Sequence, residues 1–321
     1  MSFSEQLKTE ILSKRFKQSC CKMALLSGFL RSAGSLDGTM QSKGVVIKGF
    51  EFATESILIR DFIKDIIIDL YGEIVDTTMY TDPISKKDRH ILYASNDKAV
   101  ELLKDLGIIS VSEKGESSIV LGIDKYVVEN DCCKKAYILG VFLAVGVITV
   151  PKIDEKSRTG YHLEFAFSNN TLADEFCHLL SSCGFMPKNI NRKSEKVVYF
   201  NKIEDILSVL AFFKTMKSYF SLEQITLEKD IRNDTNRIIN CEMSNLNKQV
   251  DASLKQIKCI EQIENTIGLD GISPQLKVVA LARKEYADST LDELSKILGI
   301  TKSCLNHRLR KIVEIAENLT V

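Results

Sequence analysis

The chain has no tryptophan, only four prolines and four histidines among its 321 residues, and no excess of either charge. Lysine and arginine together number 43, and aspartate and glutamate also number 43. This balance excludes a uniformly basic, histone-like DNA-binding protein and an acidic tail. Any affinity for nucleic acid must therefore come from a local patch of basic side chains.

The sequence also lacks a long apolar segment. Its longest nearly apolar run, residues 136–150, is bounded by Lys134–Lys135 and Pro151 and is shorter than the roughly 20 residues that a membrane span needs. We interpret it as a buried helix that runs into a strand. The first residues are polar and do not resemble a secretory signal, so the nine cysteines are expected to stay reduced in the cytoplasm.

The remaining composition is that of a folded protein. Hydrophobic residues make up 45% and charged residues 27%, which argues against a disordered or fibrous chain. At about 150 residues per domain, the length predicts two domains.

A segment near the N-terminus recurs in the middle of the chain. Residues 20–34, CCKMALLSGFLRSAG, match residues 132–146, CCKKAYILGVFLAVG, at a constant offset. In each copy small residues recur at every fourth position, and these are Ala24, Gly28 and Ser32, then Ala136, Gly140 and Ala144. On helices this spacing forms two stripes without bulk, which let two backbones approach closely. We therefore predict a pseudo-symmetric pair of units joined at these two helices.

The segments that follow each copy also correspond. Alternating and periodic apolar residues predict strands at 35–40, 44–52, 73–80 and 89–94 and helices at 54–71 and 99–106 after the first copy. After the second copy they predict strands at 147–150, 161–168, 188–192 and 196–200 and helices at 172–183 and 203–213. Each unit is thus α-β-β-α-β-β-α. The predicted fold class is α+β, with two antiparallel sheets that form a saddle, each covered by helices on one face.

The C-terminal part has the pattern of a helix-turn-helix. Residues 291–298 form a short amphipathic helix that Ser289 or Thr290 can cap, and Gly299 supplies the left-handed residue that ends it. Ile300 fills the small core, and Thr301 can cap the next helix. A preceding helix, 274–286, starts at a proline and completes a three-helix module.

The helix after the turn separates apolar from polar residues. Leu305, Leu309, Ile312 and Ala316 share one face, and no acidic residue occurs from residue 302 to residue 313. This arrangement is typical of a recognition helix, in which side chains near the start contact base edges and cations contact phosphates. Asn306 could pair with adenine and an arginine with guanine, each pair contributing roughly 1–3 kcal/mol of discrimination. The alternative is a helical hairpin with a basic, solvated face. The candidate DNA-binding residues are Lys302, Ser303, Asn306, His307, Arg308, Arg310 and Lys311.

An asparagine-rich segment, residues 232–248, lies between these parts of the chain and leads into a predicted connecting helix at 252–267. Asparagine is a mediocre helix former, so its abundance needs a reason. Its amides and the neighbouring guanidinium groups can bond either to DNA or to another domain, and the sequence does not choose between them. The candidate contacts are Arg232, Asn236, Arg237 and Asn240.

Two motifs together indicate a family. Residues 26–34 and 138–146 resemble degenerate LAGLIDADG helices of homing endonucleases, and residues 306–311, NHRLRK, resemble the end of the WhiA helix-turn-helix. The asparagine-rich segment is also typical of that family, and nearly the whole chain resembles it. WhiA proteins are bacterial DNA-binding regulators of sporulation and cell division. We therefore predict a LAGLIDADG-like domain at 1–218, with repeats at about 15–108 and 128–215, then a linker helix region at 219–270 and a helix-turn-helix domain at 271–321.

The nuclease activity of LAGLIDADG proteins depends on one acid just before the closing glycine of each motif. These two carboxylates bind the divalent metal ions that activate water. Here the positions hold Ala33 and Val145, which offer no oxygen ligand. Asp37 lies close to the first motif, but the second has no acid before Asp154. We therefore predict no catalytic residue, no cofactor and no metal.

Other features admit two interpretations. Basic residues in loops and strands, at Lys86, Lys87 and Arg89 and at Lys188, Arg192, Lys193 and Lys196, either contact phosphates or are ordinary solvated charges. Zinc ligands are usually spaced Cys-x2–4-Cys, so Cys20–Cys21 and Cys132–Cys133 do not fit that pattern and favour a structural role. Neighbouring residues on a helix point about 100° apart, so one cysteine of each pair should face the core.

The resulting expectation is a non-enzymatic, sequence-specific regulator that binds double-stranded DNA in the cytoplasm, at the nucleoid, without membrane contact. The resemblance implies transcription control linked to cell division, chromosome segregation or sporulation, and contact with RNA polymerase or a co-regulator. One alternative is a residual metal-dependent endonuclease. Another is a cell-division scaffold that binds protein partners and for which DNA binding is incidental.

Overall fold

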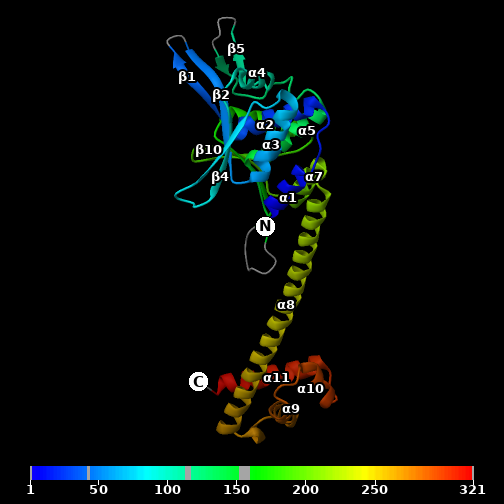
Figure 1. Ribbon diagram of the computed structural model, residues 1–321. Helices are drawn as coiled ribbons and strands as arrows, with labels where there is room; N and C mark the ends of the chain where they lie inside the picture. The colour runs from blue at the N-terminus through cyan, green and yellow to red at the C-terminus, as the bar shows by residue number, and fades with distance from the viewer. Residues whose placement is uncertain (1, 42–43, 113–116, 152–159, 320–321) are drawn as a thin grey trace. The chain divides into compact units, whose positions relative to one another are not determined.

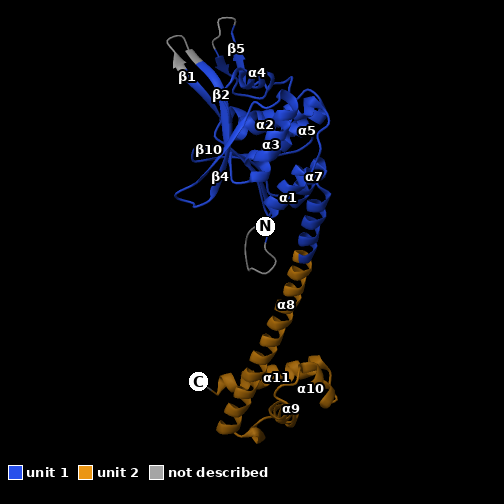
Figure 2. Cartoon of the chain, viewed as in Figure 1, with its two compact units in different colours: residues 1–228 blue, residues 229–321 orange. Residues whose placement is uncertain are grey.

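The computed structural model describes residues 2–41, 44–112, 117–151 and 160–319. The chain divides into two compact units, residues 1–228 and 229–321, which Figure 2 colours separately. Each unit has its own hydrophobic core among the described residues. The domain boundaries predicted at residues 218 and 270 lie close to the ends of one long helix, α8 (Met216–Thr266), and they stay predictions.

Unit 1 has the predicted repeating order of helices and strands (Figure 1). Its first part consists of α1 (Phe3–Leu12), α2 (Ser19–Ala33), β1 (Gly34–Gln41), β2 (Gly44–Thr54), α3 (Ile57–Tyr71), β3 (Asp76–Thr81), β4 (Asp88–Ala94), α4 (Asp97–Asp105), β5 (Ile109–Val111) and β6 (Ser117–Ile119). Its second part consists of α5 (Asp131–Val145), β7 (Gly146–Thr149), β8 (His162–Phe167), α6 (Asn170–Ser182), β9 (Lys188–Arg192), β10 (Glu195–Phe200) and α7 (Ile203–Phe213). The predicted α+β class and the two αββαββα repeats are confirmed.

The first sheet is larger than predicted. Its strands follow the order β3-β4-β2-β6-β5, with β1 on β2, and every pair is antiparallel. The short β5–β6 hairpin joins the sheet where Val45 pairs with Ser117. This hairpin was not predicted, because each of its strands has three residues and is too short for an alternating pattern.

The second sheet has the predicted four strands, in the order β7-β8-β10-β9. Leu163, Phe165 and Phe167 of β8 are buried, and the residues between them are partly exposed. This alternation confirms the predicted sidedness of the strand. Helix α6 packs against the buried face of β8 and β10, so the opposite face of the sheet is turned away from the helices.

The two repeats meet where α2 and α5 pack side by side (Figure 1). A Cβ atom on Gly28 would overlap the backbone carbonyl of Tyr137, and one on Gly140 would overlap the carbonyl of Leu25. The predicted close approach along the small-residue stripes is therefore confirmed. As predicted from the apolar run, α5 is buried and continues directly into β7.

Unit 2 contains the second part of α8, a short 3-10 turn (Leu269–Gly271), α9 (Pro274–Glu285), α10 (Leu291–Ile297) and α11 (Lys302–Asn318). The predicted helices at 252–267, 274–286 and 291–298 are present, to within a few residues at their ends. No helix among the described residues is long and apolar enough to cross a membrane.

Candidate nucleic-acid interface

The helix-turn-helix is positioned by three local signals that the sequence contains. Thr290 caps α10 in a capping box with Glu293, and these backbone and side-chain hydrogen bonds hold the pKa of Glu293 below its usual value. Gly299 adopts a φ of +64°, which ends α10 without the strain that a Cβ would cause. The Thr301 side chain then accepts a hydrogen bond from the backbone of Cys304 and starts α11. Of the two predicted caps for α10, the structure has Thr290.

The core of unit 2 fixes which face of α11 is exposed. Leu305, Leu309, Ile312 and Ala316 are buried, as predicted. They pack in one cluster with buried residues of the other helices, which include Ile260, Ile263, Val279, Ala280 and Leu294. Burial of this apolar stripe determines the rotation of α11, so its polar stripe must face away from the core.

A buried arginine braces the helix-turn-helix. Arg283 of α9 is 1% exposed, and it donates hydrogen bonds to Gln256 Oε1 of α8 (2.9 Å) and to the Ser289 carbonyl before α10 (2.7 Å). Burial lowers the pKa of Arg283, but an arginine stays charged because its ordinary pKa is above 12. These bonds join α8, α9 and the start of α10. Arg283 lies in the predicted helix 274–286, and the sequence does not indicate its partners.

The candidate recognition residues form one surface, which we call the α11 face. Lys302, Ser303, His307, Arg310 and Lys311 are exposed, and Asn306 and Arg308 are partly exposed. Arg308 reaches Gln275 Oε1 at 3.5 Å. Within the described chain, no carboxylate lies within 4.0 Å of the basic groups of Lys302, Arg310 or Lys311. The α11 face thus presents four cations and three neutral hydrogen-bonding side chains.

The asparagine-rich segment lies in α8. Every residue from 231 to 248 is exposed, so this part of the helix contributes no side chain to the described core of unit 2. Arg232, Asn236 and Asn240 are four residues apart and share one side of the helix, with Arg237 next to them. Arg237 forms an ion pair with Asp234 at 3.5 Å. The two predicted alternatives, contact with DNA or docking to another domain, both stay predictions.

The candidate basic residues of the second sheet share the sheet with acidic residues. By outer face we mean the sheet face turned away from the helices. The register places Lys188 and Arg192 on the outer face of the second sheet together with Glu164 and Glu195, and Arg192 lies 3.5 Å from Glu164. Lys193 occupies the β9–β10 turn with φ of +53°, and Lys196 instead points to the helix side, where it pairs with Asp174.

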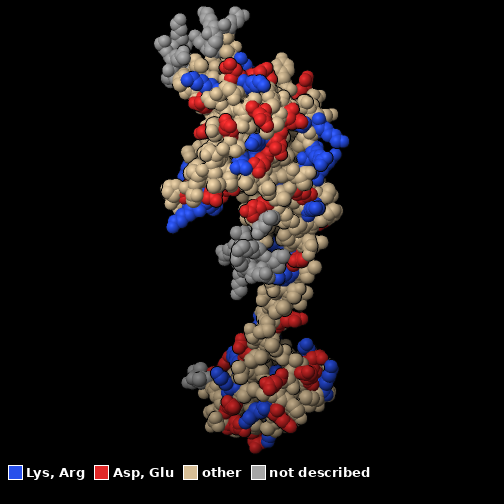
Figure 3. Space-filling view, in the orientation of Figure 1, with Lys and Arg blue, Asp and Glu red and all other residues tan. Residues whose placement is uncertain are grey.

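Acids outnumber cations on the part of the outer face of the first sheet that lies before its β-bulge. Before the bulge at Asp37/Gly38, the register places one cation, Arg89, on this face, together with three acids, Asp37, Glu51 and Asp76. Arg89 and Lys87 both pair with Glu55, at 3.3 and 2.8 Å. On the side of the molecule shown in Figure 3, acidic and basic side chains lie close to one another.

The positions of the nuclease acids lie at the ends of the central helices. Ala33 is the last residue of α2 and Val145 the last of α5, and both are partly buried. The nearby Asp37 accepts a hydrogen bond from Ser95 at 3.1 Å. In the described chain, one group of three or more candidate metal ligands converges, and it lies at the opposite ends of these helices, where Cys20, Cys21, Cys132 and Cys133 meet. The sequence reasoning treated each cysteine pair alone and missed this convergence.

Comparison with known proteins gives consistent matches along the chain. The model of the WhiA LAGLIDADG-like domain matches residues 134–232, and that of the WhiA C-terminal HTH domain matches residues 235–316. A "Probable cell division protein WhiA" from Thermoanaerobacter pseudethanolicus is 36% identical, and one from Alkaliphilus oremlandii is 34% identical. Each match covers 99% of this chain and 98% of the relative.

A solved structure supports the fold. The crystal structure described as full-length DUF199/WhiA from "Thermatoga maritima" superposes with a TM-score of 0.56 at 22% identity, over 99% of both chains. The LAGLIDADG-like repeat, the helix-turn-helix and the full-length relatives agree with one another. The chain therefore belongs to the WhiA family.

Proposed function

We propose that this chain is a non-enzymatic transcription regulator that binds a specific double-stranded DNA sequence through the α11 face. The observation that supports it most is the exposed, acid-free run of cations and amides on a helix whose rotation is fixed by a buried core. Asn306 and Arg310 would contact base edges, and Lys302, Arg308 and Lys311 would contact phosphates. The names of the relatives support a link to cell division.

The cellular setting is a further part of this proposal. A DNA-binding regulator of a bacterium would act at the nucleoid in the cytoplasm, on genes of cell division, chromosome segregation or sporulation. It would act through RNA polymerase or a co-regulator. A transcription assay with purified polymerase tests this part. The wild-type chain should change transcript levels relative to a reaction without it, whereas an α11 variant that cannot bind its site should leave them unchanged.

The deciding experiment is fluorescence anisotropy of labelled duplexes, selected from a random library, across a salt series with Mg²⁺ present. Four to six phosphate contacts predict a slope of log affinity against log salt of about −4 to −5. Selective binding that Arg310→Ala abolishes would support the regulator. Equal affinity for all duplexes, or no binding, would contradict it and favour a protein-interaction scaffold.

The same samples, run on a denaturing gel, test the nuclease alternative. With Ala33 and Val145 at the acid positions, we expect intact strands. Mg²⁺-dependent cutting that is lost in Asp37→Asn would contradict the non-enzymatic part of the proposal and leave the DNA-binding part in place.

A further inference from the structure

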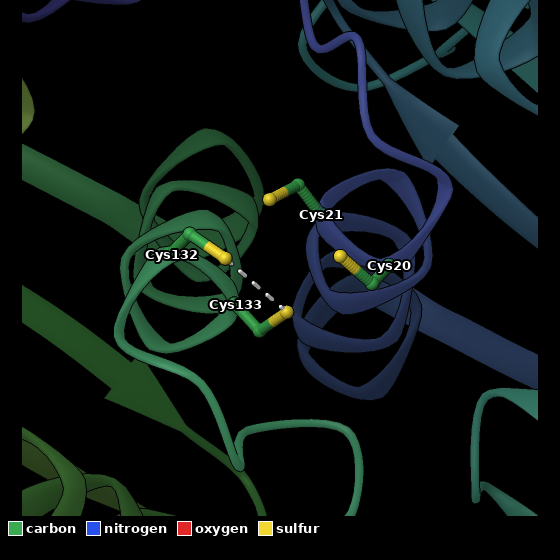
Figure 4. A group of neighbouring side chains, drawn as sticks. All are labelled: Cys20, Cys21, Cys132 and Cys133. Atoms are coloured by element: carbon green, nitrogen blue, oxygen red, sulfur yellow. Dashed lines mark hydrogen bonds between the residues drawn. The ribbon is translucent and has the colours of Figure 1, made fainter.

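Four cysteines meet between the N-terminal ends of α2 and α5. Cys20 and Cys21 lie in the first turn of α2, and Cys132 and Cys133 lie in the first turn of α5. Their four Sγ atoms all lie within 4.8 Å of one another, and the Sγ atoms of Cys132 and Cys133 are 3.9 Å apart. Figure 4 shows the four side chains gathered in the space between the two helices.

The pseudo-symmetry explains this convergence. Each pair occupies the same two positions of its repeat. Two turns further along the helices, the close packing at Gly28 and Gly140 holds α2 and α5 together. Cys21 and Cys133 are 8% and 3% exposed, whereas Cys20 and Cys132 are exposed. One cysteine of each pair thus faces the core, as predicted, and the exposed cysteines leave a path for an ion to enter.

The arrangement matches the needs of a mononuclear thiolate site. A tetrahedral Zn²⁺ ion with Zn–S bonds of about 2.3 Å requires sulfur atoms about 3.8 Å apart. The observed separations, at most 4.8 Å, reach this value by small side-chain rotations. Soft thiolate ligands select Zn²⁺, Cu⁺ or iron, and tetrahedral S4 geometry favours Zn²⁺ or iron. A multi-iron cluster needs more space, because its sulfur ligands bind different metal atoms.

We propose that Cys20, Cys21, Cys132 and Cys133 form a structural Zn²⁺ site that ties α2 to α5. Four protein ligands fill the coordination sphere and leave no open position for a reacting water, so the site is structural rather than catalytic. It also lies at the opposite ends of the helices from Ala33 and Val145, so it does not replace the metal site of LAGLIDADG nucleases.

The surroundings compensate the charge of the site. Four thiolates around Zn²⁺ carry a net charge of −2, and both helices point their positive N-terminal ends at the sulfur atoms. The side chains of the N-cap residues Gln18 and Asn130 do not cap the backbone of their helices. Gln18 Oε1 instead accepts hydrogen bonds from the thiols of Cys20 and Cys21, at 4.0 and 3.4 Å. Thiolates bound to the ion no longer donate to Gln18, and the positive N-terminal ends of the two helices stabilise their charge.

The test uses the full-length chain, purified under reducing conditions with Zn²⁺ and dialysed. We expect about one equivalent of Zn²⁺ per chain by mass spectrometry, and replacement by Co²⁺ should give the visible and charge-transfer absorption of a tetrahedral thiolate complex. Cys20→Ser with Cys132→Ser changes the two exposed ligands and should lower the content to less than about a tenth of an equivalent. The matched control, Cys177→Ser with Cys241→Ser, should keep the metal.

Thermal unfolding gives a second readout. A strong chelator should lower the unfolding temperature of the wild-type chain and of the control, and should leave that of the Cys20→Ser/Cys132→Ser variant unchanged. If that variant does not fold, the single change Cys20→Ser takes its place. Reduced wild-type chain without stoichiometric Zn²⁺, a cysteine variant that retains it, or thiol titration that finds these four cysteines as disulfides would each overturn the proposal.

Discussion

The α11 face and the outer faces of the two sheets differ in how their charges are arranged. From residue 302 to residue 313, α11 carries four cations and no acid. The first sheet places Arg89 among three acids, and the second sheet balances Lys188 and Arg192 with two acids. A phosphate backbone is attracted by uncompensated cations and is repelled by carboxylates. If the chain binds DNA as proposed, this difference predicts that the affinity is concentrated in unit 2, although unit 1 has the LAGLIDADG-like fold.

The sharpest test of this comparison reverses the charge of the α11 face. Arg310→Glu with Lys311→Glu replaces two cations by two acids. We expect the affinity for DNA, measured in anisotropy titrations, to fall by a factor of about 100 or more. The matched control, Lys98→Glu with Lys104→Glu, makes the same change on two exposed residues of α4. Equal losses in both variants would mean that net charge, and not the α11 face, decides binding.

Removing one neutral side chain should affect selectivity more than affinity. Asn306→Ala deletes an amide that can read adenine, and we expect the ratio of specific to non-specific affinity to fall about tenfold. The salt slope should stay unchanged, because no cation is lost. Competition titrations with a selected duplex and a scrambled duplex measure both quantities. An unchanged ratio would show that Asn306 does not contact a base.

Loosening the start of α11 should weaken the helix that presents the face. Thr301→Ala removes the cap hydrogen bond to Cys304 and should cost about 1 kcal/mol of stability. Hydrogen exchange of the α11 amides, followed by mass spectrometry, should accelerate about fivefold. Thr235→Ala is the control, since Thr235 bonds only to Ile231 within α8 and caps no helix. The prediction is wrong if both variants exchange alike.

Neutralising the second sheet should have the smallest effect. Lys188→Ala with Arg192→Ala removes two cations from the sheet face that also carries Glu164 and Glu195, and we expect the affinity for DNA to change less than about threefold. Anisotropy at low salt is the most sensitive measurement. A loss comparable with that of the α11 variant would place DNA on the saddle of sheets as well and would remove the contrast between the units.

Most of the secondary structure could be predicted, because the apolar period is clear within each element. Leu163, Phe165 and Phe167 alternate in β8, and Leu305, Leu309 and Ile312 follow a helical period in α11. These patterns are local, and burial acts on them directly. The β5–β6 hairpin was not predicted, because three residues per strand are too few to show a period.

The candidate site was harder to predict, because its properties depend on residues far apart in the sequence. The charge balance of the second sheet follows from the pairing of Arg192 with Glu195 and from its closeness to Glu164, which only the strand register reveals. The group of four cysteines was not predicted for the same reason. Rules for metal sites compare ligands along one segment, whereas Cys20 and Cys132 meet because two distant helices pack together.

Because both repeats of unit 1 lie in one polypeptide, a mutation can change one repeat without changing the other. In a dimer of identical subunits, every mutation appears on both sides of the axis. Here a substitution alters one side alone, and the two halves have diverged. In the described residues, the first sheet includes the short β5–β6 hairpin and the second sheet has no equivalent. At Gly28 and Gly140, however, each half contacts the backbone of the other. The centre therefore constrains both halves jointly, while their peripheries are free to specialise separately.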